Sequence, residues 1–401
     1  MKNICEICKG KNLPVVLNLG KHPLCDDLIK VGSNKKSKFY KIEVIFCKNC
    51  ITAYQKYQVP KKKLFPPSYH YRSKFTKDVI SGLQDVVKNS KIFSGSLKDK
   101  VVLDIGCNDG SLLDIFKKEK SITIGIEPTN SADEARVKGH KIYKSYIDLK
   151  TISNLKKSYP KIDIITFVNV FAHIENLSEL IQNLKKLLSR ETILVIENHY
   201  LGSIIEKKQF DTFYHEHPRT YSFKSFIKIS KLLGTNIISY KFPKRYGGNI
   251  RVIFSNKIKK KLNFDKIINQ EKKYFSNIKK LSKDIEVWRE KKLKIINSLV
   301  KKFGPLPAKA FPGRAAILIK LLDLNERHIS KIFERDKSIK IGNYAPGTKI
   351  PIVSDVHLKK IDKDVPIINF AWHINKEIKN YLKKDSVKNK VIDILNQQDF
   401  K

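Results

Sequence analysis

The sequence predicts an α/β protein built on a mostly parallel sheet, and three features of the chain support that fold class. Residues Val101–Ile105 are apolar except for Asp104, as in a strand that is buried on both faces. A turn containing Gly106 and Gly110 follows, and a helix begins near Ser111. Further apolar strands then alternate with helical segments. In a sheet of this kind, ligands bind at the carboxyl ends of the strands.

Composition limits the classes of partner. The 401 residues include 80 Lys and Arg against 39 Asp and Glu, which gives a formal net charge of +41 and room for two or three domains. Such an excess is typical of nucleic-acid-binding proteins, but here the lysines are spread over every segment, so nucleic acid is not the expected partner. The positive field would still attract an anionic substrate. No run of about 18 apolar residues occurs and Met1 leads into no apolar segment, so we expect a cytoplasmic protein without a membrane partner.

Two C-x2-C motifs near the amino end predict a metal site, the first formed by Cys5 and Cys8 and the second by Cys47 and Cys50. In a reducing compartment, such pairs hold a tetrahedral zinc ion through four thiolates rather than forming disulfides. No histidine or carboxylate stands out beside them as an activating group. We therefore expect a structural zinc ion and a small zinc-binding module at residues 1–65.

The segment that joins this module to the central strand is rich in prolines and aromatic residues. Residues 65–73 read as a linker, and a helix is predicted for Thr76–Val87. Beyond the central turn, a second strand ends in Glu127, where a carboxylate could accept both hydroxyls of a ribose. The turn is neither G-x-G-x-x-G nor a P-loop, so dinucleotide and nucleoside-triphosphate sites are weakly supported.

Strands and helices continue to alternate along the middle of the chain, where His173 follows one strand and Arg251 lies in another. Predicted elements are helices at 131–139, 177–188 and 227–233 and strands at 141–143, 162–170, 191–197, 236–240 and 250–254. His173 lies just beyond the 162–170 strand, where it could be functional or merely structural. Arg251 lies in the last of these strands, where it could bind a phosphate or form a surface salt bridge.

The densest group of chemically active side chains lies in Phe210–Ser222, which contains Tyr214, His215, Glu216 and His217. The proline that follows them prevents one continuous helix. The H-x-H pair could bind a metal, although the H-E-x-x-H pattern is absent. The run Tyr-His-Glu-His suits proton transfer equally well, and spacing alone does not decide between the two.

The carboxyl-terminal part begins with a long helix and then returns to α/β alternation. Residues 259–302 contain no glycine and are predicted to be helical, with an apolar seam formed by Tyr274, Ile278, Leu281, Ile285 and Trp288. We expect this seam to pack against the α/β domains or a partner subunit, and residues 301–307 to end the helix. The elements expected after it are helices at 315–324 and 374–382 and strands at 329–334, 350–353 and 366–372.

Two resemblances extend these predictions. Residues Val101–Leu113 resemble the cofactor motif of class I S-adenosylmethionine-dependent methyltransferases, in which the position of Asp104 lies near the methionine end of the cofactor. The order of the C-x2-C motifs, Tyr-x-Tyr-x-Ser, the glycine turn, Asn-Val-Phe-Ala-His, Tyr-His-Glu-His and Gly-Gly-Asn-x-Arg resembles the nucleotide-sugar C-methyltransferase family over nearly the whole chain. Enzymes of that family add a methyl group to a ring carbon of deoxysugars destined for antibiotics or surface glycans.

The resemblance implies a fold, two cofactors and a reaction. It implies a class I methyltransferase (Rossmann-like) core with a small N-terminal zinc-binding module and a C-terminal α/β domain, at residues 66–240, 1–65 and 241–401 respectively, with a helical connector at 259–302. The implied cofactors are S-adenosylmethionine and a structural Zn²⁺. The expected reaction is methyl transfer to a carbon next to a ketone of a keto-deoxysugar nucleotide, through an enolate.

The resemblance also selects His217 rather than His215 as the general base. Carbon is a weak nucleophile, so a base must first form the enolate, and an imidazole beside phenols suits both needs. Glu216 would orient or polarise the cluster, while Tyr214, His173 and Tyr71 would hydrogen-bond the enolate oxygen. The expected cofactor-binding residues are Asp104, Gly106, Asn108, Gly110, Glu127 (on the ribose) and Asn169, and the expected zinc ligands are Cys5, Cys8, Cys47 and Cys50.

Two departures from the family pattern concern the substrate. Where the family has a Gly-Ala-x-x-Lys-Gly turn, this chain has Phe311-Pro-Gly-Arg-Ala-Ala316, whose proline removes a backbone donor, so we expect the nucleotide to be held differently. Pro218 and Arg219 also depart from the pattern. Alternative functions are an O-methyltransferase of a related glycan or small-molecule precursor, or a nucleic-acid methyltransferase or binder. The sequence identifies neither the sugar nor the acceptor atom, and allows a monomer or a homodimer.

Overall fold

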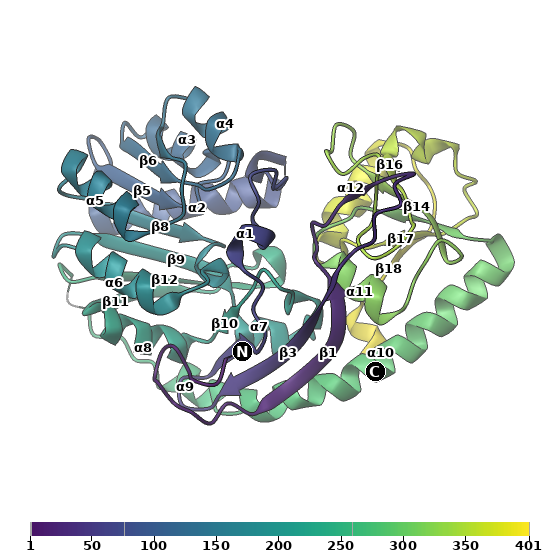
Figure 1. Ribbon diagram of the computed structural model, residues 1–401, viewed down its shortest axis with the longest axis horizontal. Coiled ribbons are helices and arrows are strands. Elements are labelled where there is room, and N and C mark those ends of the chain that lie inside the picture. Colours follow the sequence, from purple (N-terminus) through teal and green to yellow (C-terminus); the bar gives the residue numbers. More distant parts are fainter. Residues whose placement is uncertain (1, 76, 259, 401) are drawn as a thin grey trace.

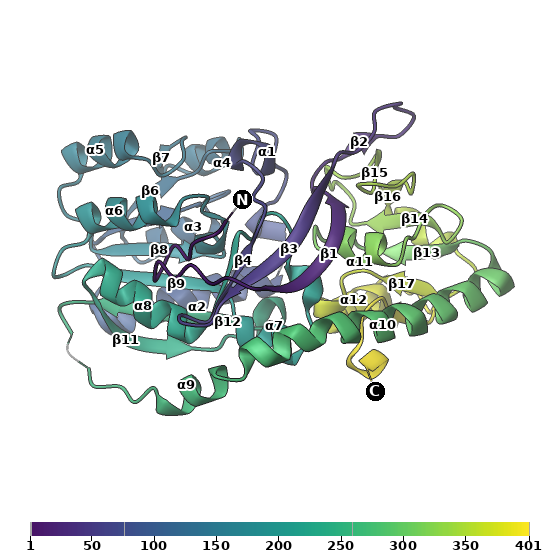
Figure 2. The same cartoon turned by 60° about the horizontal axis from the view of Figure 1, so that its bottom comes forward.

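The computed structural model describes residues 2–75, 77–258 and 260–400. Three larger sheets make up the molecule, and Figure 1 shows the central sheet and the C-terminal sheet on opposite sides of the long ribbon formed by β1 (Val15–Pro23) and β3 (Phe39–Cys47). The long helix α10 (Tyr274–Phe303) runs along the base of all three, as the turned view in Figure 2 makes clear. None of the helices in the described ranges is long and apolar enough to cross a bilayer.

The central sheet has seven strands in the order β11-β12-β9-β8-β5-β6-β7. Its strands are β5 (Val101–Ile105), β6 (Ile122–Ile126), β7 (Lys141–Tyr143), β8 (Ile164–Val168), β9 (Ile193–His199), β11 (Asn236–Lys241) and β12 (Asn249–Ser255). Six of them run in one direction, whereas β12 is antiparallel to both of its neighbours, β9 and β11. This is the strand arrangement of the class I methyltransferase fold, so the predicted fold class is confirmed.

Helices cover both faces of this sheet because each presents an apolar stripe to it. On one face lie α2 (Lys77–Ser94) and α3 (Ser111–Lys118), and on the other α5 (Leu149–Ser158), α6 (Leu177–Leu187) and α8 (Phe223–Leu233). The helix α4 (Ser131–Val137) packs beside β7, and α7 (Leu201–Glu206) follows β9. Thr76, the first residue of the predicted helix 76–87, lies outside the described residues, and α2 continues to Ser94. The helix predicted at 227–233 begins earlier, because Ser222 and Ser225 form a capping box.

The amino-terminal module is a four-stranded sheet in the order β1-β3-β4-β10, which the sequence analysis did not predict. Its third strand is β4 (Thr52–Gln55), and its fourth, β10 (Arg219–Tyr221), comes from the chain directly after the His217 cluster. Two short elements complete the module, the strand β2 (Ile29–Lys30) and the helix α1 (Lys61–Leu64). Since β2 pairs with β15 (Asn343–Tyr344), the module contacts the C-terminal domain as well as the central one.

The C-terminal sheet is parallel throughout, in the order β16-β14-β13-β17-β18. Its strands are β13 (Leu306–Lys309), β14 (Ile329–Glu334), β16 (Ile352–Ser354), β17 (Ile367–Asn369) and β18 (Val391–Asp393), and its helices are α11 (Ala315–Leu321) and α12 (Asn375–Lys384). Residues 301–307 were expected only to break the helix, yet Leu306 and Pro307 begin the middle strand. A register shift between these two residues interrupts the ladder at the proline, which has no N–H to donate.

The predicted helix 259–302 is two helices, α9 (Asp265–Glu271) and α10, and residue 259 lies outside the described residues. The apolar seam of α10 is buried within the chain, against β1, α7 and β13. At its centre, the indole of Trp288 donates a hydrogen bond to the carbonyl oxygen of Ile394 at 2.9 Å. The predicted domain limit at residue 240 falls before β12, which pairs with β9 and so belongs to the central sheet.

Candidate functional site

A cavity of about 640 Å³ lies between the central and C-terminal sheets, a size that suits small-molecule ligands. It opens at the carboxyl ends of β5, β6, β8 and β9 on one side and of β13 and β14 on the other. The linker at residues 65–74 and the loop residue Asp26 of the amino-terminal module close its remaining edges. All three parts of the chain therefore contribute to one site.

The glycine turn and Glu127 form one end of this cavity. Gly106 has φ +70°, and a Cβ there would lie 2.6 Å from Cγ2 of Val170, so only glycine fits. The buried carboxylate of Glu127 accepts hydrogen bonds from the backbone N–H of Asn108 at 3.1 Å and of Thr129 at 2.9 Å. Each oxygen can accept one more bond, so the carboxylate can still hold two ribose hydroxyls.

Two of the residues expected to bind the cofactor lie beneath the cavity wall rather than in it. Asp104 accepts a hydrogen bond from the hydroxyl of Thr166 at 2.6 Å, and burial raises its pKa to about 7. Gly110 packs the start of α3 against α4, because a Cβ there would lie 2.9 Å from Cβ of Ala135. Any effect of these two residues on a ligand is therefore indirect.

The other two, Asn108 and Asn169, line the cavity but also hold neighbouring segments. The side chain of Asn108 accepts from the backbone N–H of Ser73 at 3.0 Å and donates to the carbonyl of Tyr71 at 3.0 Å. It thus fastens the linker over the glycine turn. Asn169 accepts a hydrogen bond from the side-chain amide of Asn249 at 3.1 Å, which ties the end of β8 to β12.

His217 is buried at the middle of the cavity and is held in one tautomer. Its Nδ1 donates to the carbonyl oxygen of Thr212 at 2.9 Å, so Nε2 retains its lone pair. The ring of Tyr214 lies 4.3 Å away and that of His173 5.0 Å away, both between ring centroids. Burial, together with the neighbouring histidines, lowers the pKa of His217 well below its usual range, so the imidazole is neutral at neutral pH.

His215 points away from this cavity. Its Nε2 contacts the carbonyl oxygen of Tyr40 in the amino-terminal module at 3.2 Å, and burial lowers its pKa to about 4. Of the two histidines in the Tyr-His-Glu-His run, only His217 lines the cavity, together with Tyr214 and Glu216. The structure gives the choice of His217 a geometric reason that spacing alone did not provide.

The remaining residues of the predicted catalytic set are distributed around His217. His173 donates through Nδ1 to the backbone carbonyl of Glu216 at 2.8 Å, and burial lowers its pKa to about 4. The carboxylate of Glu216 accepts from the hydroxyl of Tyr69 at 3.1 Å, and burial raises its pKa. The hydroxyl of Tyr71 shares a hydrogen bond of 2.9 Å with that of Tyr246.

Sequence reasoning missed His199 and Tyr246, which line the same cavity. His199 ends β9, with its ring 5.2 Å from that of His217 and 5.8 Å from that of Tyr246. The rule already applied to His173 also gives His199, which is at the carboxyl end of a parallel strand, but it does not give Tyr246, which lies in the 3₁₀ turn Arg245–Gly247 before β12. The strand predicted at 191–197 ended two residues too early to show His199.

Arg251 forms salt bridges, as one of its two alternatives expected, but it does so inside the protein rather than on the surface. Its side chain is buried and donates to Glu197 at 2.6 Å and to Asp85 at 2.5 Å. Glu197 also accepts from Arg245 and from Asn249. The fully buried carboxylate of Glu197 thus lies between the guanidinium groups of Arg245 and Arg251. Because its guanidinium is already paired, Arg251 is not available to bind a phosphate.

Arg219 likewise has no contact with the cavity. It is buried, and its guanidinium donates to Glu6 at 2.7 Å and to the carbonyl oxygen of Glu175 at 2.9 Å. It therefore fastens the amino-terminal module to the loop after His173. The departure at this position concerns the packing of the module rather than the substrate.

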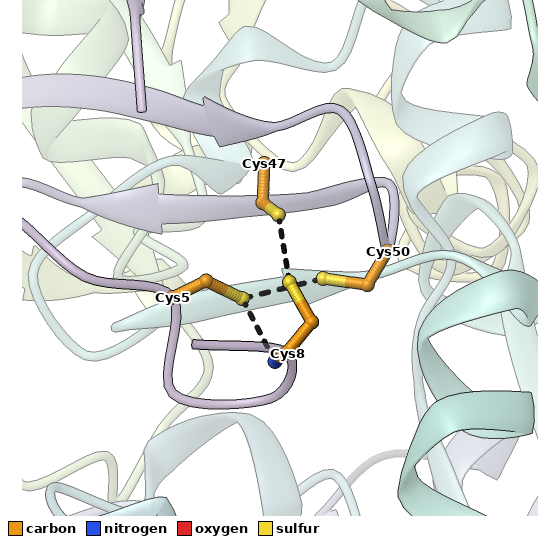
Figure 3. Close-up of side chains that lie close together, drawn as sticks. All are labelled: Cys5, Cys8, Cys47 and Cys50. Carbon is orange, nitrogen blue, oxygen red and sulfur yellow. Dashed lines mark hydrogen bonds between the residues drawn. The ribbon is translucent and has the colours of Figure 1, made fainter. Parts of the chain in front are cut away.

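The four cysteines of the two C-x2-C motifs point toward one another, as Figure 3 shows. Their sulfurs all lie within 4.8 Å of one another, with Sγ of Cys5 3.3 Å from that of Cys50 and Sγ of Cys8 3.4 Å from that of Cys47. Tetrahedral zinc, with Zn–S bonds of about 2.3 Å, separates its sulfurs by about 3.8 Å. The donor set and its spacing therefore fit a zinc ion.

The electrostatics of this cluster also favour a bound cation. Hydrogen bonds from Cys47 and Cys50 lower the pKa of Cys5, whereas the pKa values of Cys47 and Cys50 are raised by their sulfur neighbours. Without a metal, one thiolate is thus stabilised at the expense of the others, and a dication removes that conflict. Within the described ranges, no other His, Cys, Asp and Glu side chains gather closely enough to hold a metal.

Comparisons with known proteins match successive parts of the chain. Family models match residues 5–65 as a putative zinc binding domain, residues 75–240 as a methyltransferase domain and residues 244–391 as a C-methyltransferase C-terminal domain. A curated relative, the C-methyltransferase NovU of Streptomyces niveus, is 21% identical over 253 residues, which are 63% of this chain and 60% of that protein. The match thus spans less than two thirds of the relative's length.

Solved structures resemble part of the chain at low identity. Magnesium protoporphyrin IX methyltransferase from Synechocystis PCC 6803 with bound SAM is 17% identical, with 44% of this chain and 79% of that chain covered and a TM-score of 0.34. The PH0226 protein from Pyrococcus horikoshii OT3 is 11% identical, with 48% and 97% covered and a TM-score of 0.37. In succession, the chain is thus similar to a putative zinc binding domain, a methyltransferase domain and a C-methyltransferase C-terminal domain.

Proposed function

We propose that this protein methylates a carbon next to the ketone of a keto-deoxysugar nucleotide, with S-adenosylmethionine as methyl donor. The C-methyltransferase C-terminal domain and the similarity to NovU support transfer to carbon. The pairing of a ribose-binding carboxylate, Glu127, with a buried imidazole, His217, in one cavity supports the rest. When bound, S-adenosylmethionine supplies an electrophilic methyl group on its sulfonium.

The neutral imidazole of His217 is the observation on which the mechanism rests. A carbon acceptor must first lose a proton, and Nε2 of His217 is the only ring nitrogen of that residue free to take it, since Nδ1 donates to Thr212. The electron pair of the broken C–H bond then moves onto the ketone as an enolate. The carbon forms its bond to the methyl group while the bond from methyl to sulfur breaks, and the proton leaves His217 for solvent.

Phenol groups beside His217 suit the charge that develops on the ketone oxygen. Tyr214 is the nearest ring, and Tyr71 and Tyr246 share a hydroxyl hydrogen bond on the same cavity. Preorganised donors of this kind lower the energy of an enolate more than that of the ketone. An acceptor oxygen would need the base but no enolate stabiliser, so this arrangement favours carbon over the alternative of O-methylation.

The wall from the C-terminal domain suits the anionic part of the substrate. Arg335, Lys337 and Lys340 line it, close to the carboxyl end of β14. The backbone N–H of Phe311 already donates to Glu334 at 2.6 Å, so the turn at 311–316 offers fewer donors than a glycine-rich turn would. We therefore infer that the diphosphate is met by the basic side chains after β14 rather than by the turn.

The test uses purified protein, S-adenosylmethionine and nucleotide-linked keto-deoxysugars carrying deuterium at the acceptor carbon. The expected products are S-adenosylhomocysteine and a sugar whose new methyl group is attached to carbon, as determined by NMR. His217→Asn should bind both ligands but neither wash out deuterium nor transfer methyl. His215→Asn, the same substitution two residues earlier, should retain both activities. Methyl on oxygen, or unchanged washout in His217→Asn, would contradict the proposal.

A further inference from the structure

Arg314, in the turn that departs from the family pattern, contacts the loop that precedes the proposed base, His217. Arg314 is only 7% exposed, and its guanidinium forms a bidentate ion pair with the carboxylate of Asp211. In this pair, Nε of Arg314 donates to Asp211 at 2.8 Å, and Nη2 donates to the other carboxylate oxygen. Nη2 also donates to the hydroxyl of Thr212 at 2.8 Å. Arg314 belongs to the C-terminal domain, whereas Asp211 and Thr212 belong to the 3₁₀ turn Phe210–Thr212 beside the central sheet.

A second residue of the C-terminal domain completes this contact. The indole N–H of Trp372 donates to Asp211 at 2.8 Å, and the guanidinium of Arg314 lies 5.1 Å from the centre of the Trp372 ring. Asp211 is fully buried, so its charge depends on these partners. Because the contact between Arg314 and Asp211 is bidentate, it fixes the relative orientation of the two side chains as well as the distance between them.

The loop held in this way is the one that orients His217. The carbonyl oxygen of Thr212 accepts from Nδ1 of His217 at 2.9 Å, so the residue that Arg314 holds through its hydroxyl holds the imidazole through its carbonyl. We propose that Arg314 is a positioning residue, which fixes the Asp211–Thr212 turn so that His217 carries its proton on Nδ1 and presents Nε2 to the cavity. This role rests on the proposed function, in which Nε2 is the proton acceptor.

A contact that only joined two domains would have a different signature. Loss of such a contact would loosen the domains and weaken ligand binding, but a folded protein would keep the same His217 tautomer. Loss of a positioning contact would lower the turnover number and mix the two tautomers, with little change in KM. Lysine cannot reproduce the fork, so Arg314→Lys keeps the charge and removes the geometry.

The experiment compares the full-length zinc-loaded protein with Arg314→Lys, Arg314→Gln and the control Lys320→Gln, which removes an exposed cation from the same helix. Nitrogen chemical shifts of ¹⁵N-labelled histidine report the His217 tautomer in the ligand-free protein, with the resonance assigned through His217→Asn. We expect a pure Nδ1–H tautomer in the parent and control, and a mixture in both Arg314 variants. In the washout assay, kcat should fall about 100-fold in these variants, as a misplaced reacting group implies, with KM changed less than about threefold.

The two readouts separate the possible failures. An inactive parent with the expected tautomer change would remove the proposed function and leave the positioning of His217 by Arg314 standing. An unchanged His217 tautomer in a folded Arg314→Gln would overturn the positioning role, as would a loss confined to KM. If Arg314→Gln does not fold, the conservative Arg314→Lys carries the same test, because it keeps a cation beside Asp211.

Discussion

Replacing Glu127 by alanine tests the cofactor end of the cavity. In the parent, the carboxylate is oriented by two backbone donors, the N–H groups of Asn108 and Thr129 at 3.1 and 2.9 Å, and each oxygen has one further acceptor site. Hydrogen bonds from ribose hydroxyls to such a charged, fixed acceptor contribute about 1.5–3 kcal/mol. Their loss corresponds to a rise in Kd of roughly 10- to 150-fold.

Isothermal titration calorimetry with S-adenosylhomocysteine measures this loss directly, without a sugar substrate. Glu127→Gln should fall between parent and alanine, because the amide keeps one acceptor oxygen but loses the charge. Glu119→Ala is the matched control, since that exposed carboxylate is paired only with Lys91 at 2.7 Å on the outside of the domain. An affinity for S-adenosylhomocysteine that is unaltered in Glu127→Ala would refute the assignment of this carboxylate to the ribose.

Three further predictions concern the metal, the glycine turn and pH. Elemental analysis should find one zinc per chain, and X-ray absorption should give a distance of about 2.3 Å from zinc to each sulfur. Cys47→Ser should lose the metal and lower the melting temperature, and a metal content unchanged by that substitution would contradict the site. Gly106→Ala should abolish calorimetric cofactor binding, because its Cβ would lie 2.6 Å from Val170, and tight binding by that variant would show that the turn adjusts. Burial depresses the pKa of His173 and His215 to about 4, so the unfolded chain takes up protons first as the pH falls below about 6.5. The free energy of unfolding should therefore fall between pH 7 and pH 5 by about 1–2 kcal/mol per histidine, and urea denaturation that shows a rise instead would contradict this sign.

The central sheet could be predicted because its signals are local. Runs such as Val101–Ile105 are apolar throughout, and glycine turns or capping residues mark where each helix starts. The amino-terminal sheet could not, since β4 is completed by β10, a strand more than a hundred residues away in the sequence. The middle strand of the C-terminal sheet was hidden by Pro307, which local rules interpret as a breaker.

The candidate site divides in the same way. Glu127 was predicted from its place at a strand end and His217 from the family resemblance, and both line the cavity. His199 was missed because the end of its strand was placed too early. Asp104 lies in the expected strand and Gly110 in the expected turn, but both face packed protein rather than the cavity, a distinction that position in the sequence does not give.

The arginines show why charge in a sequence does not identify a ligand site. Arg251 was a candidate for binding a phosphate, and Arg219 and Arg314 lie in segments whose departure from the family pattern concerned the substrate. Each is buried and paired with a carboxylate from a distant segment, namely Glu197, Glu6 and Asp211 respectively. A guanidinium paired inside the protein cannot turn to a phosphate without leaving a buried carboxylate uncompensated, which costs several kcal/mol. On the proposed function, the anionic end of the substrate is therefore met by other cations that line the cavity, such as Lys337. Arg219 instead holds the loop after His173, Arg314 holds the turn before His217, and Arg251 joins β12 to β9 and α2.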